Sequence, residues 1–139
     1  MTVRPSQPRR TARIAFGDDQ VFSAVVGTRL IEYVDAATAA DEDAAAAIAA
    51  VVDGKLTELN RHIYQDGQAS LVRLDSADGA RIYRRSLTFL LIAVARQVFP
   101  EASVYVEHSI TNGGYFCQIE GRPPLSADEL AMLEQEMRN

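Results

Sequence analysis

The chain has 139 residues, with 19 acidic residues against 14 Lys and Arg, a net charge of −5 and one cysteine. This length fits one domain or two small lobes. The negative balance argues against a protein that works mainly by gripping nucleic-acid phosphates, and a lone Cys117 excludes an internal disulfide framework. The longest apolar run, residues 87–95, is far shorter than the roughly 20 residues that span a bilayer, and the N-terminus lacks the apolar segment of a secretory signal. We therefore expect a cytoplasmic protein with no membrane partner.

The chain is predicted to begin with a flexible tail and a β-hairpin. Residues 1–10 carry prolines and arginines but no apolar period, which is typical of a tail. Alternating apolar side chains predict a half-buried strand over residues 11–16, and a second strand over residues 20–26 completes a hairpin. Thr28 is the predicted N-cap of a helix over residues 29–39. Leu30, Ile31 and Val34 are the predicted anchors of this helix in the core.

A second hairpin is predicted around Asp53-Gly54. Asp-Gly between two apolar runs is a strong hairpin signal, so residues 48–52 and 55–59 are predicted to pair as strands. After a turn at Asp66-Gly67, a further strand is expected over residues 69–74. A hairpin, a helix and then two or three strands fit a small β-grasp (ubiquitin-like) fold, in which one helix packs on a mixed sheet.

The polar, turn-prone residues 76–79 are predicted to separate a first domain, residues 11–75, from a second, residues 76–139. The second domain is expected to open with a helix over residues 86–99 that ends before Pro100. Apolar side chains occupy most of the circumference of this helix, so it is predicted to be buried nearly all round.

The rest of the second domain is predicted to be a hairpin and a final helix. Strands are expected over residues 103–107 and 115–119, joined by a turn at residues 112–114. Ser126 and Glu129 then form a complete capping-box pattern at the start of the last helix. The whole chain is therefore expected to be an α+β protein.

No pattern for catalysis, cofactor binding or metal binding stands out. The phosphate-binding and dinucleotide-binding glycine motifs are absent from the sequence. His62, His108 and Cys117 lack metal-ligand spacing. His108 and Cys117 could face each other across their hairpin, either as a nucleophilic Cys/His pair or, as we predict, as packing residues. Residues 41–43 are three consecutive acids, predicted to be a solvated loop rather than a cation site. We therefore expect no catalytic, cofactor or metal residue in this chain.

The candidate binding residues are Arg81, Arg84 and Arg85, the only compact basic cluster inside the folded part. They are expected just before the apolar helix and offer guanidinium groups to an anion or to RNA phosphates. The alternative is a solvated helix start in which they pair with Asp75 or Asp78.

Several segments resemble a known family. Residues 27–32 (GTRLIE) and 50–60 (AVVDGKLTELN) resemble the TGS domain, a β-grasp module named after threonyl-tRNA synthetase, GTPases and stringent-response proteins. Residues 78–91 (DGARIYRRSLTFLL) are similar to the start of the second N-terminal domain of threonyl-tRNA synthetase. Together with residues 99–102, 106–109 and 115–121, they closely resemble bacterial uridine or nucleoside kinase-like proteins, which carry both domains ahead of a P-loop kinase domain.

One departure limits what this resemblance implies. In the synthetase, the second domain edits mischarged tRNA, and its opening helix carries two histidines in an H-x-x-x-H pattern. Those positions are Arg85 and Phe89 here, and neither side chain offers a lone pair to a metal. Editing by this chain is therefore not expected.

The resemblance implies an accessory role. We expect the chain to be the non-catalytic, regulatory or ligand-sensing N-terminal region of a uridine or nucleoside kinase-like enzyme. Its partner would be a downstream P-loop kinase domain, and ATP and magnesium would bind only to that parent enzyme. Two alternatives stay open: an RNA-binding TGS module, and a protein-interaction adaptor that includes self-association into a homo-oligomer.

Overall fold

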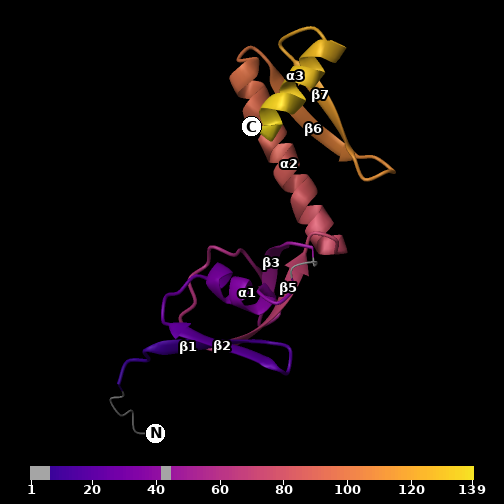
Figure 1. The fold of residues 1–139 in the computed structure, drawn as a ribbon. Helices are drawn as coiled ribbons and strands as arrows, with labels where there is room; N and C mark the ends of the chain where they lie inside the picture. Colours follow the sequence, from indigo (N-terminus) through magenta and orange to yellow (C-terminus); the bar gives the residue numbers. More distant parts are fainter. Residues whose placement is uncertain (1–6, 42–44) are drawn as a thin grey trace, which may run out of the picture. The chain divides into compact units, whose positions relative to one another are not determined.

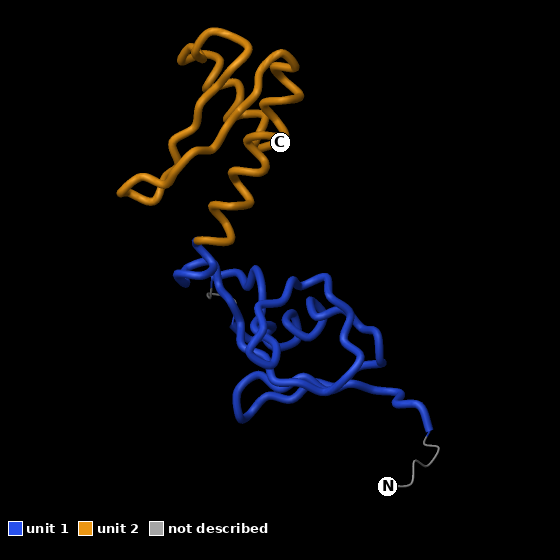
Figure 2. The backbone as a smooth tube through the Cα atoms, turned by 180° about the vertical axis from the view of Figure 1, so that it is seen from behind, with its two compact units in different colours: residues 1–80 blue, residues 81–139 orange. Residues whose placement is uncertain are grey.

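The computed structural model describes residues 7–41 and 45–139. The chain divides into two compact units, residues 1–80 and residues 81–139, which we call the β-grasp unit and the C-terminal unit (Figure 2). No helix in the described ranges is long and apolar enough to cross a membrane.

The β-grasp unit is a five-stranded mixed sheet with one helix on it (Figure 1). Its elements are β1 (Thr11–Phe16), β2 (Gln20–Val25), α1 (Leu30–Thr38), β3 (Ala47–Val52), β4 (Lys55–Thr57) and β5 (Gly67–Arg73). The strand order is β2-β1-β5-β3-β4. Only β1 and β5 pair in parallel, and the other neighbours are antiparallel. The predicted β-grasp fold and both predicted hairpins are confirmed.

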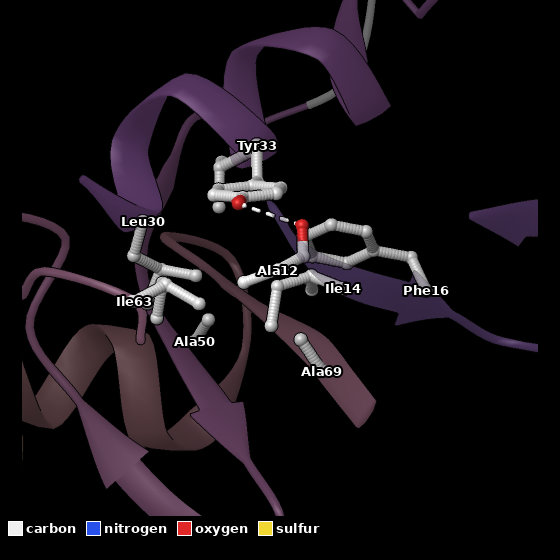
Figure 3. Close-up of a cluster of buried hydrophobic side chains, with 9 residues drawn as sticks. Ala12, Ile14, Phe16, Leu30, Tyr33, Ala50, Ile63 and Ala69 are labelled. Carbon is white, nitrogen blue, oxygen red and sulfur yellow. Dashed lines mark hydrogen bonds between the residues drawn. The ribbon is translucent and has the colours of Figure 1, made fainter. Parts of the chain in front are cut away.

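The core of this unit lies between α1 and the sheet (Figure 3). Ile14, Leu30 and Tyr33 are its largest fully buried side chains. Leu30 was predicted as an anchor, whereas the burial of Tyr33 was not predicted. The Tyr33 hydroxyl donates to the carbonyl of Ala12 at 3.1 Å. That bond lets a polar ring tip sit in the core without an unsatisfied group.

The predicted N-cap of α1 is wrong. The cap position is Arg29 rather than Thr28, and its side chain makes no capping hydrogen bond. Instead, the amides of Leu30 and Ile31 donate to the carbonyls of Arg61 and Leu59, each at 2.8 Å. A helix start needs partners for its first amides, and here a distant backbone segment provides them. The same segment explains why β4 is shorter than predicted.

The C-terminal unit contains a long helix, a hairpin and a short helix. Its elements are α2 (Ala77–Val98), which begins in the β-grasp unit, β6 (Ser103–Ser109), β7 (Tyr115–Glu120) and α3 (Ala127–Arg138). The capping box of α3 is confirmed: the amide of Glu129 donates to Ser126 Oγ at 3.2 Å, and the amide of Ser126 donates to Glu129 Oε2 at 2.9 Å. The predicted domain limits, 11–75 and 76–139, stay a prediction, because compactness does not test independent folding.

The structure corrects the start of α2, which was predicted at residue 86. Ser76 caps the helix: its Oγ accepts from the amide of Gly79 at 3.0 Å, and its carbonyl accepts from the amide of Ala80 at 2.8 Å. Gly79 is buried, and a Cβ there would lie 1.9 Å from the carbonyl oxygen of Arg73. The polar residues that were predicted to be a turn between the domains are therefore a helix cap and the first turn of α2.

The prediction that this helix is buried nearly all round is also wrong. Phe89 is 76% exposed, and Leu87 and Ile92 are each 37% exposed. The buried core of the unit is small and gathers near the end of α2; its members are Ala95, Phe99, Ala102 and Leu133. A two-stranded hairpin and one short helix have too little surface to cover all sides of a 22-residue helix.

Candidate nucleic-acid interface

The three predicted arginines lie within α2 and not before it. Arg81, Arg84 and Arg85 occupy its early turns, and all three are exposed. The expectation that they precede the helix is therefore corrected. Arg81 and Arg85 are four residues apart, so they share one face of the helix.

This face borders an open groove of about 500 Å³ within the C-terminal unit. The groove is lined from α2 by Arg81, Arg85, Thr88, Phe89 and Ile92, and from β7 by Tyr115. The helical residues follow the i, i+4, i+7, i+8, i+11 spacing of one face. Tyr115, the first residue of β7, completes the lining, and no sequence pattern had indicated it.

Arg84 does not line the groove and packs instead against the turn between β6 and β7. A Cβ on Gly113 would lie 2.7 Å from Arg84 Nη1, so the guanidinium packs closely on this glycine. Gly113 has a φ of 80°, which glycine adopts without strain. The Arg84 side chain therefore contacts the hairpin turn from α2, and it is still exposed to solvent.

The arginines and the aromatic rings together make a surface with two kinds of binding group. Neither Arg84 nor Arg85 forms an ion pair with any residue in the described part of the chain. The Phe89 ring is largely exposed beside them. Guanidinium groups bind phosphate oxygens, and exposed rings stack on unpaired bases. The arrangement suits single-stranded nucleic acid.

The possible Cys/His pair does not form across the hairpin. A register shift between Val106 and His108 places Cys117 opposite Val106 and His108 opposite Phe116. The His108 and Phe116 rings stack with centroids 5.2 Å apart. Burial raises the pKa of the Cys117 thiol, which disfavours the nucleophilic thiolate.

A metal site receives no support from the described residues. Among them, no group of three or more His, Cys, Asp or Glu side chains is placed to hold a metal ion. Of the acidic run at residues 41–43, residues 42 and 43 lie outside the described ranges. Arg85 and Phe89 both line the groove.

Comparison with known proteins gives no match to any protein-family model. The chain is, however, similar to curated threonine–tRNA ligases. It is 35% identical over 91 residues to that of Halorhodospira halophila, which covers 66% of this chain and 14% of the ligase. It is 33% identical over 94 residues to that of Cupriavidus necator, which covers 68% of this chain and 15% of the ligase. The protein of Polaromonas naphthalenivorans is 34% identical over 94 residues, with the same shares of 68% and 15%.

The chain thus spans about 15% of the length of these relatives. The similarity confirms the predicted resemblance to threonyl-tRNA synthetases over two-thirds of the chain, and it gives no support to a uridine kinase-like parent. The fold is accordingly α+β, with a β-grasp (TGS) lobe followed by part of a threonyl-tRNA synthetase editing-like domain.

Proposed function

We propose that this chain is a non-catalytic RNA-binding module that contacts RNA of the tRNA type through the groove on α2. One observation carries the proposal: Arg81 and Arg85 share a helical face with the exposed Phe89, and Tyr115 borders the same groove. The similar proteins are ligases whose names specify tRNA as substrate.

In this proposal, the arginines of the groove bind the phosphates of the RNA and its aromatic rings bind the bases. The guanidinium groups of the arginine cluster neutralise phosphates and release counterions. The Phe89 and Tyr115 rings offer stacking surfaces, and stacking contributes about 1–3 kcal/mol per base. The editing chemistry of the synthetase domain is not included in the proposal, because the two histidine positions hold Arg85 and Phe89.

The net charge of −5 is expected to lower the affinity of the chain for RNA. Repulsion between the acidic surface and the phosphates opposes a local cluster of three arginines. The complex should therefore be weak and strongly salt-dependent. Three phosphate contacts on single-stranded RNA correspond to a slope of about −2 in a plot of log K against log salt.

The test is a fluorescence-anisotropy titration of a labelled tRNA transcript with the purified chain, at NaCl concentrations from about 20 to 200 mM. Arg84→Gln/Arg85→Gln should weaken binding and reduce the magnitude of the salt slope by about one for each arginine that no longer binds a phosphate. Phe89→Ala should weaken binding about tenfold through the loss of stacking and leave the slope unchanged. Phe89 is exposed, so this variant should still fold.

The matched control is Arg29→Gln/Arg138→Gln, which removes the same charge from exposed arginines outside the groove. It should bind almost as wild type. Absence of binding at 20 mM salt, or equal losses in the control and in Arg84→Gln/Arg85→Gln, would contradict the proposal.

The predicted kinase context is a separate proposal, supported only by the resemblance of residues 78–91, 99–102, 106–109 and 115–121. In it, the chain is the regulatory region ahead of a P-loop kinase domain that binds ATP and magnesium. The coding sequence after Asn139 tests it: a G-K-[ST] loop would support the kinase context, and a ligase catalytic region would contradict it. Self-association is tested by light scattering on the purified chain.

A further inference from the structure

A second, smaller pocket lies within the β-grasp unit, and none of its lining residues belongs to the α2 groove. It has a volume of about 170 Å³. Its walls are the β3–β4 hairpin, with Val52, Asp53, Lys55 and Thr57, and the segment 61–65, with Ile14 of β1 also lining it. Pockets for drug-sized ligands measure about 300–1,000 Å³, so this one has room for only a small chemical group.

Two cationic side chains are part of its lining. Lys55 and Arg61 are exposed at the pocket, and neither forms an ion pair with a residue of the described ranges. Lys55 is the only lysine in the chain. An ammonium and a guanidinium that line one cavity without an acidic partner favour an anion there.

His62 adds a group whose tautomer the structure fixes. Its Nδ1 lies 2.7 Å from the carbonyl oxygen of Gly27. A carbonyl oxygen only accepts, so Nδ1 must carry the proton and donate it. The bond also holds the imidazole in one orientation in the pocket wall. The other ring nitrogen, Nε2, takes no part in this hydrogen bond.

The carboxylate of Asp53 also lines the pocket, and its negative charge opposes the binding of an anion. Asp53 Oδ1 accepts from the amide of Gln68 at 2.8 Å. A Cβ on Gly67 would lie 2.8 Å from Asp53 Oδ2, so this carboxylate packs on the backbone at the start of β5. The hydrogen bond partly neutralises it. The two cations then outweigh one acid that already has a partner.

We propose that this pocket binds a phosphate group, either free or at the end of a small ester. A planar carboxylate is satisfied by the fork of one arginine. Donors on separate side chains, here Lys55 and Arg61, suit an anion whose oxygens point in several directions, and lysine binds phosphate as a point charge. The site goes beyond the RNA-binding proposal and shares no residue with the α2 groove.

The test is an NMR titration of the ¹⁵N-labelled full chain with inorganic phosphate, adenosine monophosphate and acetate, each at constant ionic strength. Phosphate should cause saturable amide shifts in residues 53–57 and 61–65, and acetate should cause none. Tighter binding of adenosine monophosphate than of phosphate would identify an ester as the ligand, and the reverse order would identify the free ion.

Arg61→Gln and Lys55→Gln should each weaken phosphate binding about threefold to tenfold, because each removes one charge-assisted contact. Both residues are exposed, and unchanged amide signals outside the pocket will show that the variants are folded. The control Arg10→Gln removes the same charge elsewhere in the unit and should leave the affinity unchanged. The proposal is overturned by shifts that do not saturate, by equal binding of acetate, or by wild-type affinity in both pocket variants.

Discussion

Asp66 joins segments of the β-grasp unit that are far apart in the sequence. Its carboxylate accepts from the backbone N–H of Arg13 at 2.8 Å and from the guanidinium groups of Arg9 at 3.0 Å and Arg13 at 3.3 Å. The hydrogen bond from the Arg13 N–H, followed by the charge of Arg9, lowers the pKa of Asp66. These contacts lie beside the start of the parallel β1–β5 pairing, where Ile14 is opposite Gly67.

Asp66→Asn is expected to remove a pH-dependent part of the stability of this unit. A lowered folded-state pKa stabilises the fold above the ordinary carboxyl pKa of about 3.9, and this contribution is lost as the pH falls through the lower folded-state value. Urea midpoints should therefore show wild type more stable than the variant at neutral pH, with a smaller difference in strong acid. Asp18→Asn, in an exposed turn, is the control. A difference that does not change with pH would refute this role of Asp66.

Among individual residues, the sequence predicted buried side chains that follow a local pattern. It missed residues whose role depends on contacts between elements that are distant in sequence. Leu30 and Val34 were selected by helical spacing, and both are buried. Tyr33 lies three residues after Leu30 on the same helical face, but it was not selected, because a tyrosine hydroxyl needs a partner in the core. Only the fold shows that the carbonyl of Ala12 is that partner. The arginine cluster was visible as a run, but Tyr115 joins its groove only through the tertiary fold.

Among the elements, the three helix starts show which signals the sequence contains. Ser126 and Glu129 are three residues apart and cap α3 by themselves, so that start was predicted correctly. Ser76 caps α2 while its hydroxyl donates to the carbonyl of Arg73 at 2.6 Å. Ser76 and its polar neighbours were instead predicted to be a turn between two domains. The start of α1 uses carbonyls of residues 59 and 61, which no local motif encodes.

Ser126→Ala is expected to destabilise the first turn of α3 by about 1 kcal/mol, the usual cost of losing an N-cap side chain. Amide hydrogen exchange at Glu129 should accelerate about fivefold, which corresponds to that free energy. Ser126→Asp keeps a capping oxygen and should exchange nearly as wild type. Equal rates in Ser126→Ala and wild type would show that the capping box does not limit the opening of this helix.

For the chain as a whole, the apolar pattern of α2 predicted that this helix is buried, but the pattern does not identify which elements cover its apolar face. The stripes on α2 led to a prediction of burial on nearly all sides, whereas Phe89 is 76% exposed. Periodicity reports that a helix has an apolar face. Whether the surrounding elements are large enough to cover that face is a property of the tertiary structure. The β-grasp unit was predicted more completely, since its turns and alternating strands are local signals.

A fragment of residues 1–80 is expected to fold on its own. The buried cluster of the β-grasp unit draws all its members from this part of the chain. The amide signals of β1, β3 and β5 in the fragment should therefore overlay those of the full chain in a ¹H–¹⁵N spectrum. Residues 1–62, which lack the central strand β5, are the control and should be unfolded. A collapsed spectrum for residues 1–80 would show that the unit needs the rest of the chain.

The capping of α1 by residues 59 and 61 has a consequence for the order of folding. α1 has nine residues, and isolated helices shorter than about 12–15 residues are marginal in water. Its first amides find their partners only after the chain has passed through β3 and β4 and returned. Such contacts between distant residues form at a loop-closure cost. The helix is therefore completed when the sheet closes, and the hairpins, whose partners are neighbours in sequence, are the elements able to form before it.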